Sequence, residues 1–104
     1  MKMYNKTILI GRLGNDPELT STSNGTFAKF TICNSTFENG EEKVQWHNII
    51  AVGKQANVCM EYLHKGDLCC IEGHLDTLEY ESDGETFYKH QIIAERIVFL
   101  RSKN

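Results

Sequence analysis

Apolar and β-branched residues gather in short runs separated by turn-forming residues, a pattern typical of strands. The first run covers residues 6–13 and stops at the Gly-Asn-Asp-Pro sequence of residues 14–17. A second turn signal, Ser-Asn-Gly at 23–25, precedes a run over residues 27–37. One face of that second strand is predicted to carry Ala28, Phe30 and Ile32.

A third strand is predicted over residues 43–52, after a polar turn at 38–42. Its alternation places two sets of side chains on opposite faces. One face carries Trp46, Asn48, Ile50 and Val52, and the other carries His47, Ile49 and Ala51.

The apolar residues after Gly53 recur at helical spacing, which predicts a short helix over residues 54–64. They are Ala56, Cys59, Met60 and Leu63. Lys65 and Gly66 are expected to supply a cationic last turn and a glycine cap.

A fourth strand is predicted over residues 68–80, with alternate side chains directed inward. The inward positions are Cys69, Ile71, Gly73 and Leu75. An Asp-Gly pair within residues 81–85 predicts a hairpin turn. The fifth strand, over residues 86–100, is expected to break or bend near Glu95.

Three strands, one helix and two further strands are the element order of a five-stranded OB-fold barrel, an all-β fold with one short helix between strands three and four. The length of 104 residues suits one domain spanning residues 1–104. A piece of a larger all-β sandwich is the alternative, but a sandwich leaves the helix unexplained.

The formal net charge of −3 argues mildly against a nucleic-acid partner, but the charge is unevenly distributed. Residues 67–85 contain seven acidic residues and no Lys or Arg. The rest of the chain carries all eleven basic residues against the other seven acidic ones, so it is mildly basic.

Cysteine and histidine are the residue types most typical of zinc sites. The four cysteines of this chain lack the spacing of such a site. No C-x-x-C pair occurs, and Cys69 and Cys70 point to opposite faces if they lie on a strand. The histidines show no H-x-x-x-H or H-E-x-x-H spacing, and no catalytic Ser or Cys motif is present. We therefore predict reduced, mostly buried cysteines, no metal, no cofactor and no enzymatic activity.

The first six residues lack the apolar run of a secretory signal, and no apolar run approaches the length of a membrane span. These features predict a cytoplasmic location without a membrane partner.

Five sequence blocks, in this order, resemble the bacterial single-stranded-DNA-binding protein family. The first is ILIGRLGNDPE at residues 8–18, and the second is Trp46-His47. The others are VGKQA at 52–56, EYLHKG at 61–66 and IEGHL at 71–75. Together they span nearly the whole chain.

The resemblance implies an OB fold and sequence-tolerant binding and protection of single-stranded DNA in replication, recombination or repair. It also implies a homotetramer built as a dimer of dimers, with the strand at residues 6–13 central to the dimer contact. The family carries an acidic C-terminal tail that recruits other proteins, whereas this chain stops at residues 101–104. Either the sequence is cut short of such a tail, or this is a tail-less member, in which case we expect recruitment by that route to be absent.

Holding any single strand requires aromatic faces for the bases and cations along the backbone. A lone tryptophan in a strand is more often part of a core. Trp46 nevertheless matches a stacking tryptophan of the family, and Phe37 and Tyr80 fall where the family usually has two more.

Two lysines, Lys54 and Lys65, match basic positions of the family and flank the predicted helix. Further candidate phosphate contacts lie before or on the strands. They are Lys43, Lys6, Arg12, Lys29 and Lys89.

The chain also departs from the family pattern. Val52 stands where a stacking phenylalanine is common, and Asn48 where an arginine is frequent. The sequence after the fourth strand's Gly-x-Leu is acidic rather than basic, so residues 67–85 are expected to attract DNA weakly and to shorten its path.

A different class of function is an interaction module resembling primosomal replication protein N, which would act mainly by docking to replication-restart proteins. The short length and weak basicity favour this alternative. Trp46-His47 and the block at 61–66 favour DNA binding.

Overall fold

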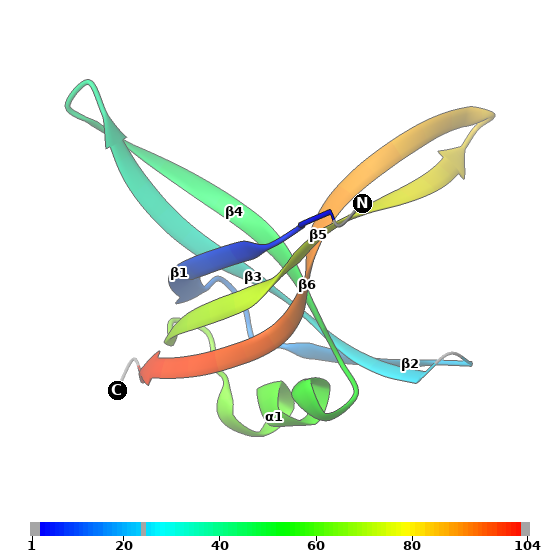
Figure 1. Cartoon of the computed structure of the whole chain (residues 1–104), viewed down its shortest axis with the longest axis horizontal. Coiled ribbons are helices and arrows are strands. Elements are labelled where there is room, and N and C mark those ends of the chain that lie inside the picture. The colour runs from blue at the N-terminus through cyan, green and yellow to red at the C-terminus, as the bar shows by residue number, and fades with distance from the viewer. Residues whose placement is uncertain (1–2, 24, 103–104) are drawn as a thin grey trace.

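The computed structural model describes residues 3–23 and 25–102, which form six strands and one helix (Figure 1). Asn24 of the predicted turn at 23–25 and residues 103–104 at the chain end lie outside the described residues. The elements are β1 (Thr7–Leu13), β2 (Glu18–Thr22), β3 (Gly25–Glu38), β4 (Glu41–Val52), α1 (Lys54–Tyr62), β5 (Leu68–Ser82) and β6 (Glu85–Arg101).

Five of the strands close into a ring, which confirms the predicted OB fold. The ring runs β1-β5-β6-β4-β3, and β1 closes it by pairing with β3 at Arg12–Cys33 and Leu13–Ile32. All neighbours are antiparallel except β4 and β6, which pair in parallel through residues 49–51 and 92–94.

The sixth strand, β2, was not predicted from the sequence. It pairs only with β3 and extends the sheet beyond the ring. All five of its residues are exposed, so it lacks the alternation of buried and exposed positions that marks a half-buried strand.

The core fills the interior of the ring and the space beneath α1. Most predicted inward positions are confirmed, since Ala28, Ile32 and Ile71 are fully buried. Leu75 was predicted inward but is 53% exposed, because β1 pairs with β5 only as far as Gly73 and β5 continues beyond it into a hairpin with β6.

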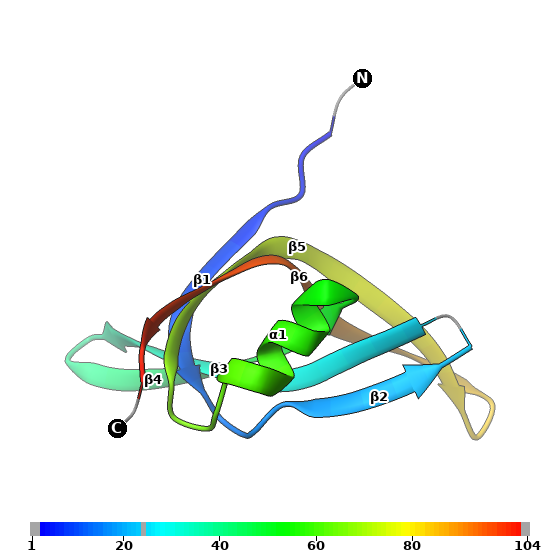
Figure 2. The same ribbon diagram turned by 90° about the horizontal axis from the view of Figure 1, so that it is seen from below.

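The helix α1 lies across one end of the ring (Figure 2) and buries Ala56 and Cys59 against it. It ends at Tyr62, two residues before the predicted end. Gly66 does not cap it, because Leu63 already has an extended backbone with φ −95° and ψ 139°. Gly66 instead adopts φ +93° in the following turn, where its N–H donates to the Leu13 carbonyl at 2.8 Å.

Two long hairpins project from the ring as separate arms (Figure 1). The first arm comprises residues 34–45 of β3 and β4, and the second comprises residues 75–91 of β5 and β6. Each tip has two consecutive residues of positive φ, Asn39-Gly40 and Asp83-Gly84, as a two-residue type I′ hairpin turn requires.

The predicted bend near Glu95 is a bulge at the base of the second arm. Glu72 pairs with Arg96, while the next residue, Gly73, pairs with Ala94, so Glu95 is the extra residue. Gly73 permits this close approach, because a Cβ there would lie 1.9 Å from the Ile93 carbonyl oxygen. Among the described residues, no helix has the length and apolar character needed to cross a membrane.

Candidate nucleic-acid interface

One face of the first arm carries exposed apolar side chains in a row. Directly opposed residues of an antiparallel pair share a face, and Cys33 lies opposite Trp46 while Phe37 lies opposite Glu42. Phe37, Val44 and Trp46 therefore lie on the same face, which we call the outer face, and they are 75%, 46% and 62% exposed.

The Trp46 ring rests on the loop between β1 and β2. A Cβ on Gly14 would lie 2.4 Å from Cζ3 of Trp46, so only glycine leaves room for the ring there. The loop is held to β3, because the Gly14 N–H donates to the Thr31 carbonyl at 2.9 Å. Asn15 Oδ1 also accepts hydrogen bonds from the Thr31 N–H (2.9 Å) and hydroxyl (2.7 Å). Trp46 is thus supported from below and open to solvent, as a stacking platform requires.

The second arm carries a pair of stacked rings. Tyr80 lies opposite Phe87, with ring centroids 5.6 Å apart and planes inclined by 24°. Sequence reasoning identified Tyr80 but missed Phe87. The Asp-Gly turn was the available signal, because a two-residue loop at 83–84 dictates that position 80 faces position 87.

Two shallow hollows connect the faces of the two arms. One is lined by Trp46, Asn48 and Gln91, and the other by Asn48, Gln91 and the lysines Lys29 and Lys89. Lys89 lies opposite Leu78, on the face that also carries Tyr80 and Phe87. The outer face therefore continues from Phe37 and Trp46 across the hollows to the stacked pair.

The other candidate cations lie elsewhere on the molecule, as far as the described contacts show. Lys43 pairs with Thr36, which places it on the reverse face of the first arm. The Arg12 guanidinium donates to the Gly66 carbonyl at 2.9 Å, and the Lys65 N–H donates to Asp16 Oδ1 at 2.8 Å, so both sit at the corner between β1 and α1. Lys54 begins α1, and Lys6 lines a separate hollow beside Glu72.

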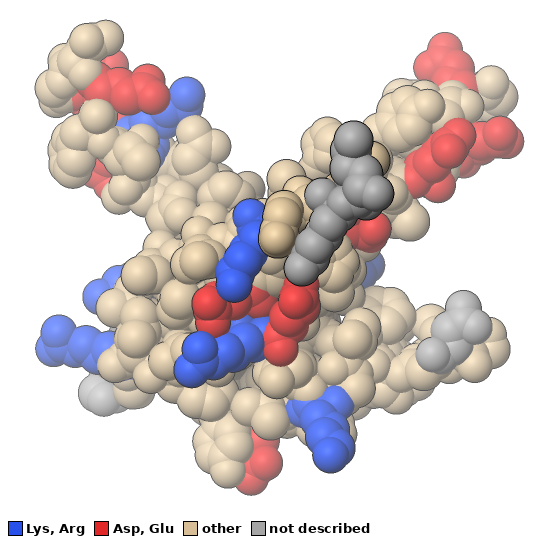
Figure 3. Space-filling view, viewed as in Figure 1, with Lys and Arg blue, Asp and Glu red and all other residues tan. Residues whose placement is uncertain are grey.

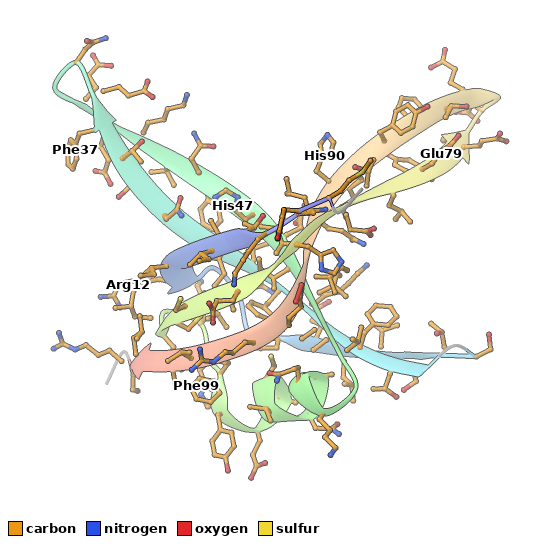
Figure 4. The ribbon with its side chains drawn as sticks, viewed as in Figure 1. Arg12, Phe37, His47, Glu79, His90 and Phe99 are labelled. Carbon is orange, nitrogen blue, oxygen red and sulfur yellow. The ribbon has the colours of Figure 1, made fainter. Side chains whose placement is uncertain are left out.

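Acidic side chains gather toward the outer ends of both arms (Figure 3). On the second arm, Glu79 and Glu81 alternate with Tyr80 and therefore project from the reverse face. Figure 4 shows Glu79 and His90 on this arm, well separated from Phe37 on the first. The alternation of side chains along the strand thus places the carboxylates of Glu79 and Glu81 on the face opposite the aromatic rings. The prediction that residues 67–85 attract DNA weakly did not take this separation into account.

The buried thiols belong to the core. Burial raises the pKa of Cys59 to about 11. Burial, helped by the neighbouring Cys59, Cys70 and Asp67, raises the pKa of Cys69 to about 12. Cys33 and Cys70 are partly buried, and all four thiols are free. No group of three or more His, Cys, Asp or Glu side chains within the described ranges is placed to hold a metal ion.

Comparison with known proteins identifies the family. The profile of the single-strand binding protein family matches residues 4–100. Single-stranded DNA-binding protein 1 of Staphylococcus aureus strain Mu50 is 45% identical over 107 residues, covering 98% of this chain and 69% of that protein. Single-stranded DNA-binding protein 1 of Chlorobaculum tepidum is 37% identical, covering 96% of this chain and 67% of that protein.

The fold is also shared with a solved structure, a Plasmodium falciparum SSB complex with ssDNA. It superposes with a TM-score of 0.88 and covers 96% of this chain and 97% of that one, at 24% identity. The fold and the sequence relatives agree with the five blocks of resemblance. The chain belongs to the single-strand binding protein family.

Proposed function

We propose that this protein binds single-stranded DNA with little sequence preference and protects it during replication, recombination or repair. The observation that carries the proposal is the exposed Trp46 ring, which is supported by Gly14 and lies on a face that continues to Tyr80 and Phe87. Exposing this much aromatic surface costs free energy unless a ligand covers it. Unpaired bases suit such a surface, because every base has a face that can stack.

The proposed path runs from Phe37 over Trp46 to the Tyr80–Phe87 pair, with bases stacked on the rings. Lys29 and Lys89 line the hollow between the arms, where they would hold the phosphates nearby. The remaining predicted cations would guide the strand around the periphery. They are Lys54, Lys65, Lys43, Lys6 and Arg12.

Glu79 and Glu81 face away from this path, so they would repel DNA only over a longer distance, where salt screens the interaction. Glu42 lies opposite Phe37 on the outer face, and Glu18 lines the hollow that Lys29 and Lys89 also line. Of the candidate cations, Lys29 and Lys89 line the hollow on the path, and the others lie at the periphery. Because few basic side chains contact the path, we expect a shallow dependence of affinity on salt.

We also propose self-association through β1, leading to a homotetramer built as a dimer of dimers. Ile8 and Ile10 are 58% and 56% exposed, and residues 7–11 of β1 have a paired neighbour only in β5. A strand with one open edge and exposed isoleucines is a ready template for pairing with a second copy. Light scattering after size-exclusion chromatography would report the assembly, and a monomer at micromolar concentration would refute it.

A cytoplasmic location stays a prediction.

The single tryptophan makes the main proposal directly testable, because Trp46 is the only such fluorophore in the chain. Titration with oligo-dT should quench its emission, and the affinity should fall as salt rises. Absence of both quenching and retention of the oligonucleotide at low salt would refute DNA binding.

A further inference from the structure

Two amide side chains, Asn48 on β4 and Gln91 on β6, line both hollows beside Trp46. A base stacked on Trp46 would direct one of its edges toward them.

The orientation of the Gln91 amide is fixed by a carboxylate. Gln91 Nε2 donates to Asp76 Oδ2 at 2.9 Å. An ionised carboxylate only accepts hydrogen bonds, so the nitrogen, not the oxygen, must face Asp76. Gln91 Oε1 is therefore the amide atom left for the hollow, and it can only accept.

The Asn48 amide is exposed and makes no hydrogen bond within the described residues. It can rotate, so it offers either its N–H donors or its carbonyl acceptor to a ligand. Together the two amides present one fixed acceptor and one adaptable group.

We infer that this amide pair favours bases with an exocyclic amino group, so that the Trp46 site prefers cytosine to uracil. The inference deepens the proposed function and depends on it. The N4 amino group of cytosine has two hydrogens and can donate to Gln91 Oε1, while cytosine N3 accepts from Asn48. Uracil and thymine place the carbonyl O4 at the same position, where it meets another acceptor and is repelled. Asn48 discriminates less, because it can turn to suit either base.

The test compares oligo-dC with oligo-dU of equal length, because these bases lack the thymine methyl group and differ only in the groups that the amides contact. Affinities are measured at one salt concentration and at pH 8, where cytosine is unprotonated. We expect the parent to bind oligo-dC about fivefold more tightly than oligo-dU. Gln91→Leu should bring the ratio close to one. Asp76→Asn should lower it as well, because an amide at position 76 no longer dictates which way Gln91 turns.

Gln45→Leu is the matched control, since Gln45 is an amide on the reverse face of the first arm. It should keep the parent's ratio. If the parent and Gln91→Leu show the same ratio while both bind DNA, the inference is overturned and the proposed function stands. If the parent binds neither homopolymer, the proposed function falls and the inference falls with it.

Discussion

The ring and the two arms are formed by the same strands, but the strands bury side chains in the ring and expose them in the arms. In the ring, every second side chain enters a closed core, as with the fully buried Ile32, Ile49 and Ile71. In the arms, none of the described hydrophobic residues at 34–45 or 75–91 is buried, and aromatic rings stand in solvent. A strand that leaves the ring loses its inner face, so both of its faces become available to a ligand.

This difference separates stability from binding. Core residues of the ring hold the fold, and they are distinct from Phe37, Trp46 and Tyr80, for which we propose a role in DNA binding. Substitutions in the two regions should therefore change different measurements, and the expected effects can be ranked.

The largest effect is expected in the ring. Ile71→Ala should lower the free energy of unfolding by about 3 kcal/mol, because it leaves a cavity in a fully buried site. Val44→Ala in the first arm should cost less than about 1 kcal/mol, since Val44 is largely exposed. Urea denaturation measures both, and equal losses would contradict the division into ring and arms.

Trp46→Ala should have the next largest effect, on binding alone. Loss of one stacking platform should weaken DNA binding by about 2 kcal/mol, or about 30-fold. The unfolding midpoint should hardly move, because the Trp46 side chain is largely exposed. Anisotropy of a labelled oligonucleotide measures the affinity. Gln45→Ala, on the opposite face of β4 and outside both hollows, is the control and should bind like the parent.

The two arm-tip aromatics should differ from each other. Tyr80→Ala removes a ring that is stacked on Phe87, so it should lower stability by about 1 kcal/mol as well as weaken binding. Phe37→Ala should weaken binding by about 1 kcal/mol without a loss of stability, because Phe37 is 75% exposed. Thermal unfolding and DNA titration of both variants would show whether the second arm is pre-ordered by its ring pair.

The free energy of unfolding should also fall at alkaline pH, because the closed ring of strands buries the Cys59 thiol. The pKa of Cys59 is about 11 in the folded state and lower in the unfolded chain, so only the unfolded thiol ionises between pH 9 and 11. The contribution of the protonated Cys59 thiol to the free energy of unfolding is intact below the pKa of the unfolded chain, and it falls by about 1 kcal/mol between pH 8 and pH 10. Denaturation curves at both values measure the loss. Cys59→Ala should reduce the pH dependence by that amount, and an unchanged dependence would speak against a buried protonated thiol.

The smallest effect concerns the reverse face of the second arm. Replacing Glu79 and Glu81 together by Gln should raise affinity by less than about threefold at physiological salt, because these charges are screened and face away from the path. Glu42→Gln, on the outer face, should raise it more per charge removed. The opposite ranking would mean that DNA follows the reverse face.

Several features could be predicted because they depend on residues close together in the sequence. The alternation at residues 28–32 and 69–71 specified inward positions, and the Asp-Gly pair specified the second hairpin. The candidate role of Trp46 came from its place in a recognisable block. Its exposure agrees with that role, although without the block a lone tryptophan in a strand would more readily have been assigned to a core.

Other features depended on which strands meet in space. Alternation states which side chains share a face, but not where a strand leaves the ring, so Leu75 was expected inside and is exposed. The support of Trp46 by Gly14 and the meeting of Asn48, Gln91 and Lys89 at common hollows arise from ring closure and the parallel pairing of β4 with β6. The sequence by itself determined the strands, turns and aromatic candidates, because these follow from local backbone preference and period. Only the tertiary structure decided which of them lie side by side, because long-range strand pairing brings together residues that are far apart along the chain.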